Sequence, residues 1–431
     1  MLVGVVLTDR ADARAALDDP LEELAGLAES AGADVAGRIV QRRAQPDVTF
    51  YLGKGKVDEL RQLVVSEEAD VALFDNDLSP GQKRNLEKEL KVKVLDRTEL
   101  ILDIFATRAR THEARLAVEL AQLEYALPRL KRMWTHLSRI KKGIGMRGPG
   151  EKQIEEDRRI VERRIRDLRE ELHTIERRRE RQVASRHDRL TISLVGYTNA
   201  GKSTLLNKLT GSDVLAMDRL FATLDTRTRR WQLPGWGPVL LSDTVGFIRD
   251  LPHQLIASFK ATLEETRQAD LLLHVADASS PDVVHQIASV YSVLEELHVE
   301  AKRTLLVLNK VDAIDEGAVH RLLDRFPNAV AISARSGYGL DRLAAVVSES
   351  LTDGFLDLDI ETSVDNGKLL AYLASHGEIR SKRFGDERVV IHCRMPAEHF
   401  GRMDKTGAVI RQHANGSANG NGQVVRQAVN E

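Results

Sequence analysis

Short apolar runs alternate with amphipathic segments over the first hundred residues. Four apolar runs predict strands, at residues 2–7, 35–40, 71–74 and 92–95. Three segments between them have the spacing of amphipathic helices, at residues 21–30, 55–66 and 80–90. Ser79 and Pro80 are typical of a helix start, as N-cap and first helical residue. This alternation predicts a small α/β domain with a parallel sheet, which we place at residues 1–108.

Two long charged segments with heptad-spaced apolar residues follow. The first seam consists of Leu116, Leu120, Leu123, Leu127 and Leu130. The second consists of Ile154, Val161, Ile165, Leu168, Leu172 and Ile175. Four glycines and one proline between residues 143 and 150 must interrupt the helix there. We therefore expect an antiparallel helical hairpin over residues 109–187, about 30–45 Å long, with residues 143–150 as its tip loop. Pro128 predicts a kink or break in the first helix.

The predicted tip and its approach are basic. The tip carries Ile144 and Met146 among the cations Lys141, Lys142 and Arg147. The approach adds Lys131, Arg132, Trp134, His136 and Arg139. Positive charge interleaved with an aromatic ring is typical of surfaces that contact RNA. Two interpretations of the tip stay open, namely a probe that contacts RNA or protein and a solvated linker between the two helices.

A phosphate-binding pattern follows the hairpin. An apolar run at 190–195 leads into Gly196, Tyr197, Thr198, Asn199, Ala200, Gly201, Lys202 and Ser203, and a helix-forming run begins at Thr204. The order strand, G-x-x-x-x-G-K-S and helix is that of a phosphate loop, whose N–H groups point at anionic oxygens. In such a loop Lys202 reaches the β- and γ-phosphates, and Ser203 is a ligand of Mg²⁺.

Two later strand ends predict the base. The apolar run 304–308 ends in Asn309, Lys310, Val311 and Asp312, and the run 329–332 ends in Ser333, Ala334 and Arg335. A carboxylate at Asp312 can accept two hydrogen bonds from guanine, whereas adenine would leave it poorly paired at a cost of a few kcal/mol. We expect Asn309 and Lys310 to brace the base and the phosphate loop. The substrate is therefore expected to be GTP.

The segment between the phosphate loop and the base-reading residues offers metal ligands and switches. A strand ends in Asp243, Thr244, Val245 and Gly246, and the first switch is expected at Phe221, Ala222, Thr223, Leu224 and Asp225. Asp243 would hold Mg²⁺ through water, and the Gly246 amide would contact the γ-phosphate. Thr223 is the candidate for a second hydroxyl on Mg²⁺, with an ordinary loop threonine as the alternative. Lys202, Thr223 and Gly246 are thus the catalytic candidates.

Two residues near these motifs suggest how hydrolysis is controlled. Phe247 stands where many GTPases have a glutamine that orients the attacking water, and a phenyl ring cannot do so by hydrogen bonding. We expect slow basal hydrolysis that a partner or a second loop completes. Asn199 suggests that the loop supports a K⁺ ion, which would stabilise the charge of the transition state as an arginine finger does.

Pattern and composition limit the class of protein. A net charge of −2 gives no global attraction to nucleic acid, although charged residues make up 30% of the chain. The single Cys393 excludes an internal disulfide framework and fits a plain core thiol. No stretch of 18 apolar residues and no signal peptide is evident, so we expect a cytoplasmic monomer without a membrane partner. After a GTPase domain at 188–352, strand- and helix-like segments predict a small α+β domain at 353–404 and a disordered tail at 405–431.

These motifs together resemble the HflX family of ribosome-associated GTPases. Besides the GTPase motifs, the likeness rests on residues 53–56, 78–87, 94–98, 101–105, 109–113, 145–151 and 251–253. Lys141, Lys142, Lys152 and Thr226 depart from the family pattern, and none of them removes a nucleotide ligand. The resemblance implies an α/β fold in which a P-loop GTPase domain follows the small parallel α/β domain and the hairpin and precedes the α+β domain.

The resemblance also implies partners and an activity. Family members bind the 50S ribosomal subunit and its large rRNA, hydrolyse GTP to GDP with Mg²⁺, and split or rescue stalled or idle 70S ribosomes, notably under stress. An alternative function, also enzymatic, is that of a ribosome-assembly or RNA-modification GTPase. An alternative of another class is a nucleotide-switched interaction scaffold.

Overall fold

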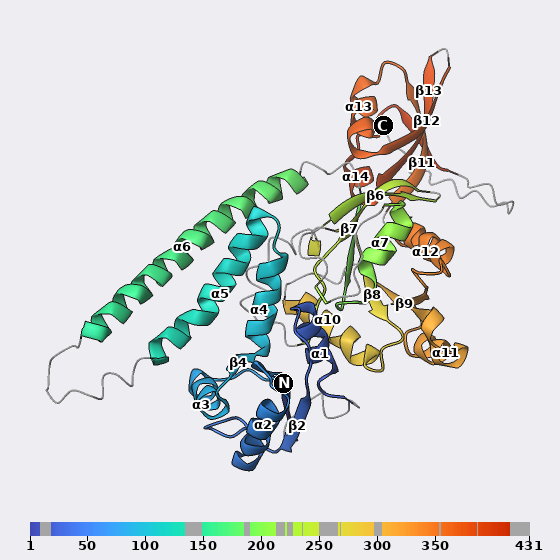
Figure 1. Ribbon diagram of the computed structural model, residues 1–431. Helices are drawn as coiled ribbons and strands as arrows, with labels where there is room; N and C mark the ends of the chain where they lie inside the picture. The colour runs from blue at the N-terminus through green and yellow to red at the C-terminus, as the bar shows by residue number, and fades with distance from the viewer. Residues whose placement is uncertain are drawn as a thin grey trace. The chain divides into compact units, whose positions relative to one another are not determined.

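The computed structural model describes most of the chain (Figure 1). The described residues are 1–8, 19–133, 149–184, 190–212, 220–221, 227–234, 236–249, 266–267, 269–296, 304–352, 355–385 and 387–413. The chain forms two compact units. One contains Met1–Ser185, Thr191–Trp231 and Val239–Leu340, and the other contains Arg186–Leu190, Gln232–Pro238 and Asp341–Glu431. Each unit is described by itself.

The N-terminal part is the predicted parallel α/β domain. Its sheet has the order β2-β1-β3-β4, formed by β1 (Leu2–Leu7), β2 (Arg38–Arg43), β3 (Val71–Phe74) and β4 (Lys93–Asp96), and all its pairs are parallel. The helices are α1 (Glu22–Ser30), α2 (Lys54–Ser66), α3 (Pro80–Leu90) and α4 (Arg97–Arg108). Ser79 caps α3 in a capping box with Gln82, as its position predicted. The strand expected at 35–40 lies three residues later, because β2 is an edge strand that continues through the polar run Gln41, Arg42 and Arg43, where an apolar pattern stops.

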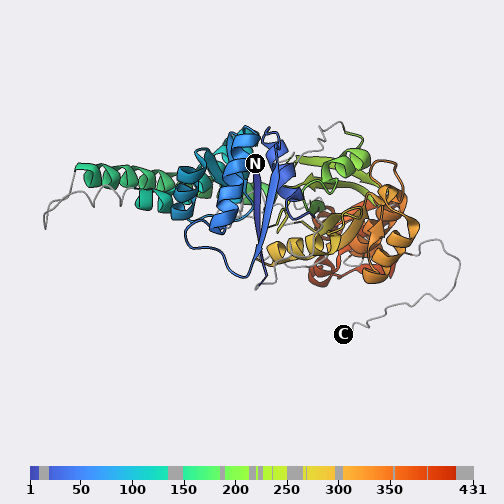
Figure 2. The ribbon, with the colours of Figure 1, turned by 60° about the horizontal axis from the view of Figure 1, so that its bottom comes forward.

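Helices α5 (His112–Met133) and α6 (Pro149–Ala184) form the hairpin, side by side in Figure 1 and Figure 2. The two seams are buried against each other, for example at Leu116, Leu120, Leu168 and Leu172. Arg164 pairs with Glu119 at 2.7 Å across the two helices, and Arg169 pairs with Glu124 at 2.6 Å. The 36 residues of α6 span about 54 Å, more than expected.

Of the kink or break predicted at Pro128, the break is wrong, because α5 continues through Pro128 to Met133. Proline removes one backbone hydrogen bond from a helix. Leu123 and Leu127, packed on the apolar core, hold this turn of α5 in place. The basic approach at 134–142 and most of the tip, up to residue 148, lie outside the described residues.

A six-stranded sheet follows the hairpin, in the order β10-β9-β8-β5-β7-β6. Its strands are β5 (Thr191–Gly196), β6 (Arg227–Leu233), β7 (Gly237–Asp243), β8 (Leu271–Asp277), β9 (Thr304–Asn309) and β10 (Val330–Ala331). The five strands from β10 to β7 are parallel. Helices α7 (Lys202–Thr210), α10 (Val283–Glu296), α11 (Glu316–Arg325) and α12 (Leu340–Thr352) alternate with them. The phosphate loop, the segment after Asp243 and the two base-reading segments each follow the carboxyl end of a parallel strand, so they meet at one edge of the sheet.

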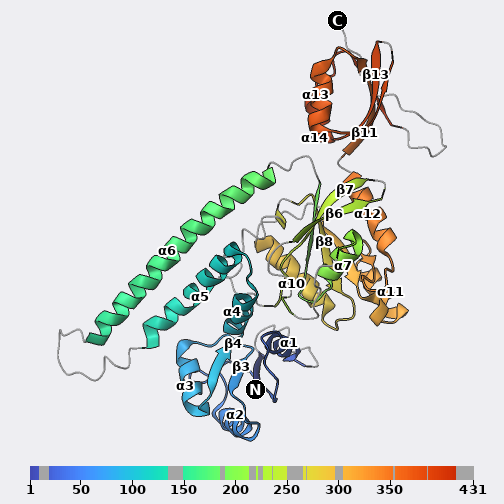
Figure 3. The same ribbon diagram turned by 45° about the horizontal axis from the view of Figure 1, so that its top comes forward.

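The C-terminal part is an antiparallel sheet covered by two helices on one face (Figure 3). Strands β11 (Phe355–Ser363), β12 (Glu378–Phe384), β13 (Arg388–Pro396) and β14 (Ala408–Gln412) have the order β12-β13-β11-β14, and the helices are α13 (Gly367–His376) and α14 (Ala397–Arg402). Cys393 is buried in its core, as expected. The tail predicted to begin at 405 is wrong for residues up to 413, since β14 pairs with β11 there. Residues 414–431 lie outside the described part.

Among the described residues, none of the helices combines the length and apolarity that crossing a bilayer requires.

Candidate nucleotide-binding site

Two glycines shape the loop between β5 and α7. Gly196 has φ of 149°, and a Cβ there would lie 2.1 Å from the Val275 carbonyl oxygen. Gly201 has φ of 91°, and a Cβ there would lie 2.3 Å from Nδ2 of Asn309. Neither position accepts a side chain. Because α7 begins at Lys202, the N–H groups of its first turn face the loop and suit an anion.

Lys202 is the buried cation of this loop. Its Nζ donates to the carbonyl oxygens of Gly196 at 3.0 Å and Tyr197 at 2.8 Å. Burial lowers the pKa of Lys202 to about 8, and the nearby Asp243 opposes that shift. An anion beside Nζ would favour the charged form, which suits a phosphate.

The first two predicted magnesium ligands lie together. Ser203, at the start of α7, donates its hydroxyl proton to Oδ2 of Asp243 at 2.5 Å. Asp243 ends β7 and is fully buried, and Thr244 beside it bonds the Leu194 carbonyl oxygen at 2.6 Å. A hydroxyl and a carboxylate at the end of a phosphate loop are the oxygen ligands that Mg²⁺ prefers. Ala222, Thr223, Leu224 and Asp225 lie outside the described residues, so the predicted second hydroxyl is not placed.

The segment after Asp243 is fastened to the phosphate loop by its backbone. Phe247 N–H donates to the Gly196 carbonyl oxygen at 3.0 Å, and Thr198 N–H donates to the Phe247 carbonyl oxygen at 2.7 Å. A Cβ on Gly246 would lie 2.8 Å from Cγ2 of Thr198 and 3.1 Å from Nζ of Lys202, so Gly246 is in contact with the loop. The Phe247 side chain is buried in the apolar core and offers no hydrogen bond to a water.

The residues predicted to read the base are joined to the loop by Asn309. Its Nδ2 donates to the Ala200 carbonyl oxygen at 2.8 Å, and its Oδ1 accepts from Ala334 N–H at 2.9 Å. Lys310 pairs with Asp277 at 2.7 Å. Asp312 is exposed in the short 3-10 helix Val311–Ala313, where its carboxylate is open to a ligand. Ser333 is buried, and Arg335 is exposed.

The sequence motifs missed an ion-pair network between the N-terminal domain and the phosphate loop. Buried Arg97 pairs with Asp75 at 2.7 Å, bonds Glu23, and donates to the Arg249 carbonyl oxygen at 3.0 Å. The Tyr197 hydroxyl donates to Glu23 at 2.9 Å and accepts from Arg249 N–H at 2.6 Å. Burial opposes the charge of Arg97, but Glu23 and Asp75 outweigh it and raise the pKa of the guanidinium.

Further contacts join α1 and α4 to the edge of the first switch. Leu220 N–H donates to the Ser30 hydroxyl at 3.0 Å, and the rings of Phe105 and Phe221 meet edge to face, 4.5 Å apart. A cavity of about 940 Å³ opens here, lined among others by Glu23, Gly26, Thr198, Asn199 and Asp277. No local motif marks Glu23 or Asp75, and the family motif at 94–98 contains Arg97 without indicating its partners, because each of the three finds its partner only through the fold.

Three family models match the chain in succession. They are described as the N-terminal part of a GTP-binding GTPase, over residues 18–106, its middle region, over 108–186, and a 50S ribosome-binding GTPase, over 191–310. GTPase HflX of Escherichia coli is 45% identical over 392 residues, which cover 90% of this chain and 92% of that protein. The chain belongs to the HflX GTPase family. The predicted family, fold class and enzyme class are therefore confirmed.

Other HflX relatives are similarly close. GTPase HflX of Magnetococcus marinus is 44% identical and covers 91% of each chain, and that of Lacrimispora saccharolytica is 42% identical and covers 94% of this chain and 95% of its own. Among solved structures, the complex of SsGBP with GDP covers 82% of this chain and 98% of its own, at 26% identity and a TM-score of 0.46.

Replacing Arg97 by alanine should strongly destabilise this HflX protein. The change removes one of the two arginines that pair with Asp75, which is 3% exposed, together with the partner of Glu23, at a cost of about 3–5 kcal/mol. Thermal unfolding should show a lower first transition for Arg97→Ala. Arg110→Ala, at an exposed position, is the matched control and should change stability by less than about 0.5 kcal/mol. Equal unfolding temperatures for the two variants would contradict the assigned network.

Nucleotide binding should take up a proton above pH 8. The free protein loses the Lys202 proton near pH 8, whereas phosphates stabilise the charged ammonium, so affinity should fall as the pH rises from 8 to 9. Calorimetry of GDP binding in buffers of different protonation enthalpy should give a larger proton uptake at pH 8.5 than at pH 7.5. The same uptake at both pH values would contradict a lowered pKa for Lys202.

Proposed function

We propose that this HflX GTPase binds the 50S ribosomal subunit and its rRNA, and that it splits or rescues stalled or idle 70S ribosomes, especially under stress. The observation that carries the proposal is the pairing of a GTPase domain with a long two-helix hairpin in one chain. The match to the 50S ribosome-binding GTPase model supports the large subunit as partner. A protein that acts on ribosomes would be cytoplasmic, and we further expect it to be monomeric.

Each described residue of the nucleotide site would have its own role in binding and hydrolysis. The loop from Gly196 to Thr204 would cradle the phosphates, with the Lys202 ammonium neutralising charge that develops on them. Oγ of Ser203 and Oδ2 of Asp243 lie 2.5 Å apart and would hold Mg²⁺, Asp243 through water, and the ion would neutralise charge on the phosphates. Gly246, in contact with the loop, would place its N–H at the γ-phosphate. Thr223 as a further ligand, and K⁺ beside Asn199, stay predictions.

Hydrolysis would be slow without a partner. The Phe247 ring is packed in the core and cannot orient the attacking water, so another group must do so. The ribosome is the proposed source of that group. GTP hydrolysis would then occur mainly while the protein is bound to the ribosome. The guanine would be kept in place by Asn309, Lys310, Val311, Asp312, Ser333, Ala334 and Arg335 of this protein.

Replacing Asp312 by asparagine should change the preferred base. An amide can pair with the carbonyl of xanthine at the position where the carboxylate accepts from the guanine amine. We expect GDP affinity to fall at least tenfold and the affinity for xanthosine diphosphate to rise, measured by competition with a fluorescent nucleotide. Asp315→Asn, a helix N-cap three residues away, is the control and should leave the preference unchanged. An unchanged preference in Asp312→Asn would remove the base-reading role.

Deleting residues 143–150 should uncouple hydrolysis from splitting. The tip loop would be lost while the nucleotide site stays complete, so we expect normal basal hydrolysis and at least tenfold slower dissociation of 70S ribosomes, measured on sucrose gradients with GTP. Deletion of 415–422, also eight residues and rich in glycine, is the control and should split normally.

The 143–150 deletant tests the role of the tip loop, and the intact protein tests the proposed function itself. Normal splitting by the 143–150 deletant would reduce the loop to a linker. No splitting by the intact chain at any ribosome concentration would contradict the proposed function itself.

A further inference from the structure

The outer face of the C-terminal sheet gathers imidazoles and carboxylates from three strands. In this sheet β11 lies between β13 and β14. Asp359 of β11 is directly opposite His392 of β13 and Arg411 of β14, and His413 follows two residues after Arg411. Because side chains alternate along a strand, these groups share the face that points away from the apolar core.

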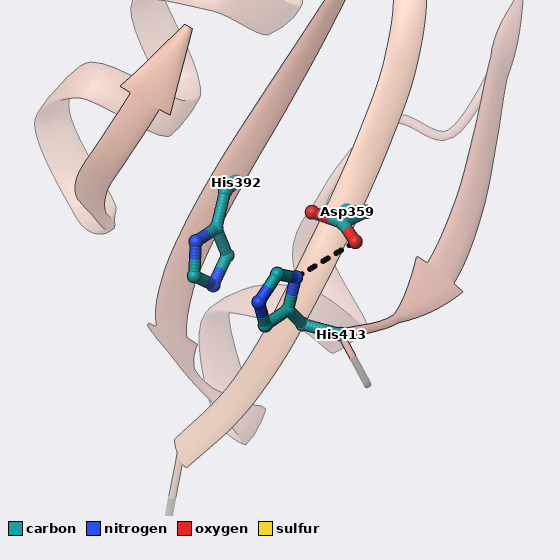
Figure 4. A group of neighbouring side chains, drawn as sticks. All are labelled: Asp359, His392 and His413. Carbon is teal, nitrogen blue, oxygen red and sulfur yellow. Dashed lines mark hydrogen bonds and ion pairs between the residues drawn. The ribbon is translucent and has the colours of Figure 1, made fainter. Parts of the chain in front are cut away.

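The side chains are close enough to act together (Figure 4). His413 Nδ1 lies 2.8 Å from Oδ2 of Asp359, and His392 Nε2 lies 2.6 Å from Oδ1 of Asp357. The two imidazole rings are stacked, with centroids 3.6 Å apart. One ligand atom from each of Asp359, His392 and His413 lies within 4.8 Å of the other two.

We propose that Asp359, His392 and His413 bind a divalent first-row transition metal ion, with Zn²⁺ as the best fit. Two imidazole nitrogens and a carboxylate oxygen form a common zinc ligand set that leaves one position for water. Ligand atoms around tetrahedral zinc are about 3.3 Å apart, since each bond is about 2.0–2.1 Å. The distances between the ligand atoms must therefore shorten by about 1.5 Å at most when the ion binds. His413 and Asp359 can move that far, because each is about one third exposed.

The surrounding charges favour zinc over harder cations. A cavity of about 400 Å³ adjoins the group and is also lined by Glu361, Arg383 and Arg411. The two arginines repel a cation that is held only by a negative field, as Mg²⁺ and Ca²⁺ are held on carboxylates. Direct bonds to imidazole nitrogens withstand that repulsion. Asp357, whose Oδ1 lies 2.6 Å from Nε2 of His392, adds a negative charge close to the ion.

Titration of the purified full chain with metal tests the site. The protein is first saturated with Mg²⁺ and GDP, so that the nucleotide site is filled, and is then titrated with Co²⁺ by visible absorption and with Zn²⁺ by competition against a chromophoric chelator. We expect one tight equivalent in the intact chain. His392→Gln and His413→Gln should each weaken it at least 100-fold, and Asp357→Asn about tenfold.

His320→Gln is the matched control, because His320 is exposed on α11 in the other compact unit. It should bind as the intact chain does. No stoichiometric binding by the intact chain, or equal affinity in His392→Gln and His413→Gln, would overturn the proposal and leave only cross-strand histidine–aspartate pairs.

Thermal unfolding guards against variants that simply fail to fold. Zn²⁺ should raise the unfolding temperature of the intact chain and of His320→Gln but not that of His413→Gln, because a ligand stabilises only a fold that binds it. An equal rise in all three would overturn the proposal. Neither readout depends on ribosomes, so the result is independent of the proposed function.

Discussion

The nucleotide site depends on two backbone hydrogen bonds that join Phe247 to Gly196 and Thr198. They fasten the segment that follows β7 to the phosphate loop, so that Gly246 touches Lys202 and Thr198. Backbone bonds of this kind leave little room for independent movement, and a γ-phosphate that contacts Gly246 must act on both segments at once. The Phe247 side chain completes the arrangement, because its burial in the core fixes the position of the backbone that makes both bonds.

The same two segments carry the contacts to the N-terminal domain. Tyr197 belongs to the phosphate loop, Arg249 follows Phe247 by two residues, and both reach Glu23 or its partner Arg97. The network is buried and charged, so it tolerates few intermediate geometries. α4, which begins at Arg97, packs on α5, and the Arg129 and Asp96 pair at 2.9 Å fixes the first hairpin helix to the end of β4. A continuous chain of packed elements thus leads from the nucleotide to the hairpin.

The strands and helices that carry the candidate site could be predicted from the sequence far better than the contacts around it. Strand ends at Gly196, Asp243 and Asn309 could be read because a buried apolar run stops abruptly at a polar residue. β6 and β14 were missed, since arginines dominate the first and a glycine-rich tail follows the second. The pairing of Glu23, Asp75 and Arg97 carries no local signal, because it joins strands and helices up to 74 residues apart. The same holds for His392 and His413, which only the register of three strands brings together. Pro128 shows the converse, in that tertiary packing of a heptad seam overrode a strong local rule.

We propose that a guanine nucleotide controls the affinity of this HflX protein for the large ribosomal subunit. Cosedimentation of the purified chain with isolated 50S subunits, in a non-hydrolysable GTP analogue, in GDP and without nucleotide, tests it most directly. The account predicts stoichiometric pelleting with the analogue, release with GDP, and a steep loss of binding as salt rises, as expected for contacts to RNA phosphates. Equal pelleting in all three states, or none in any, would contradict it.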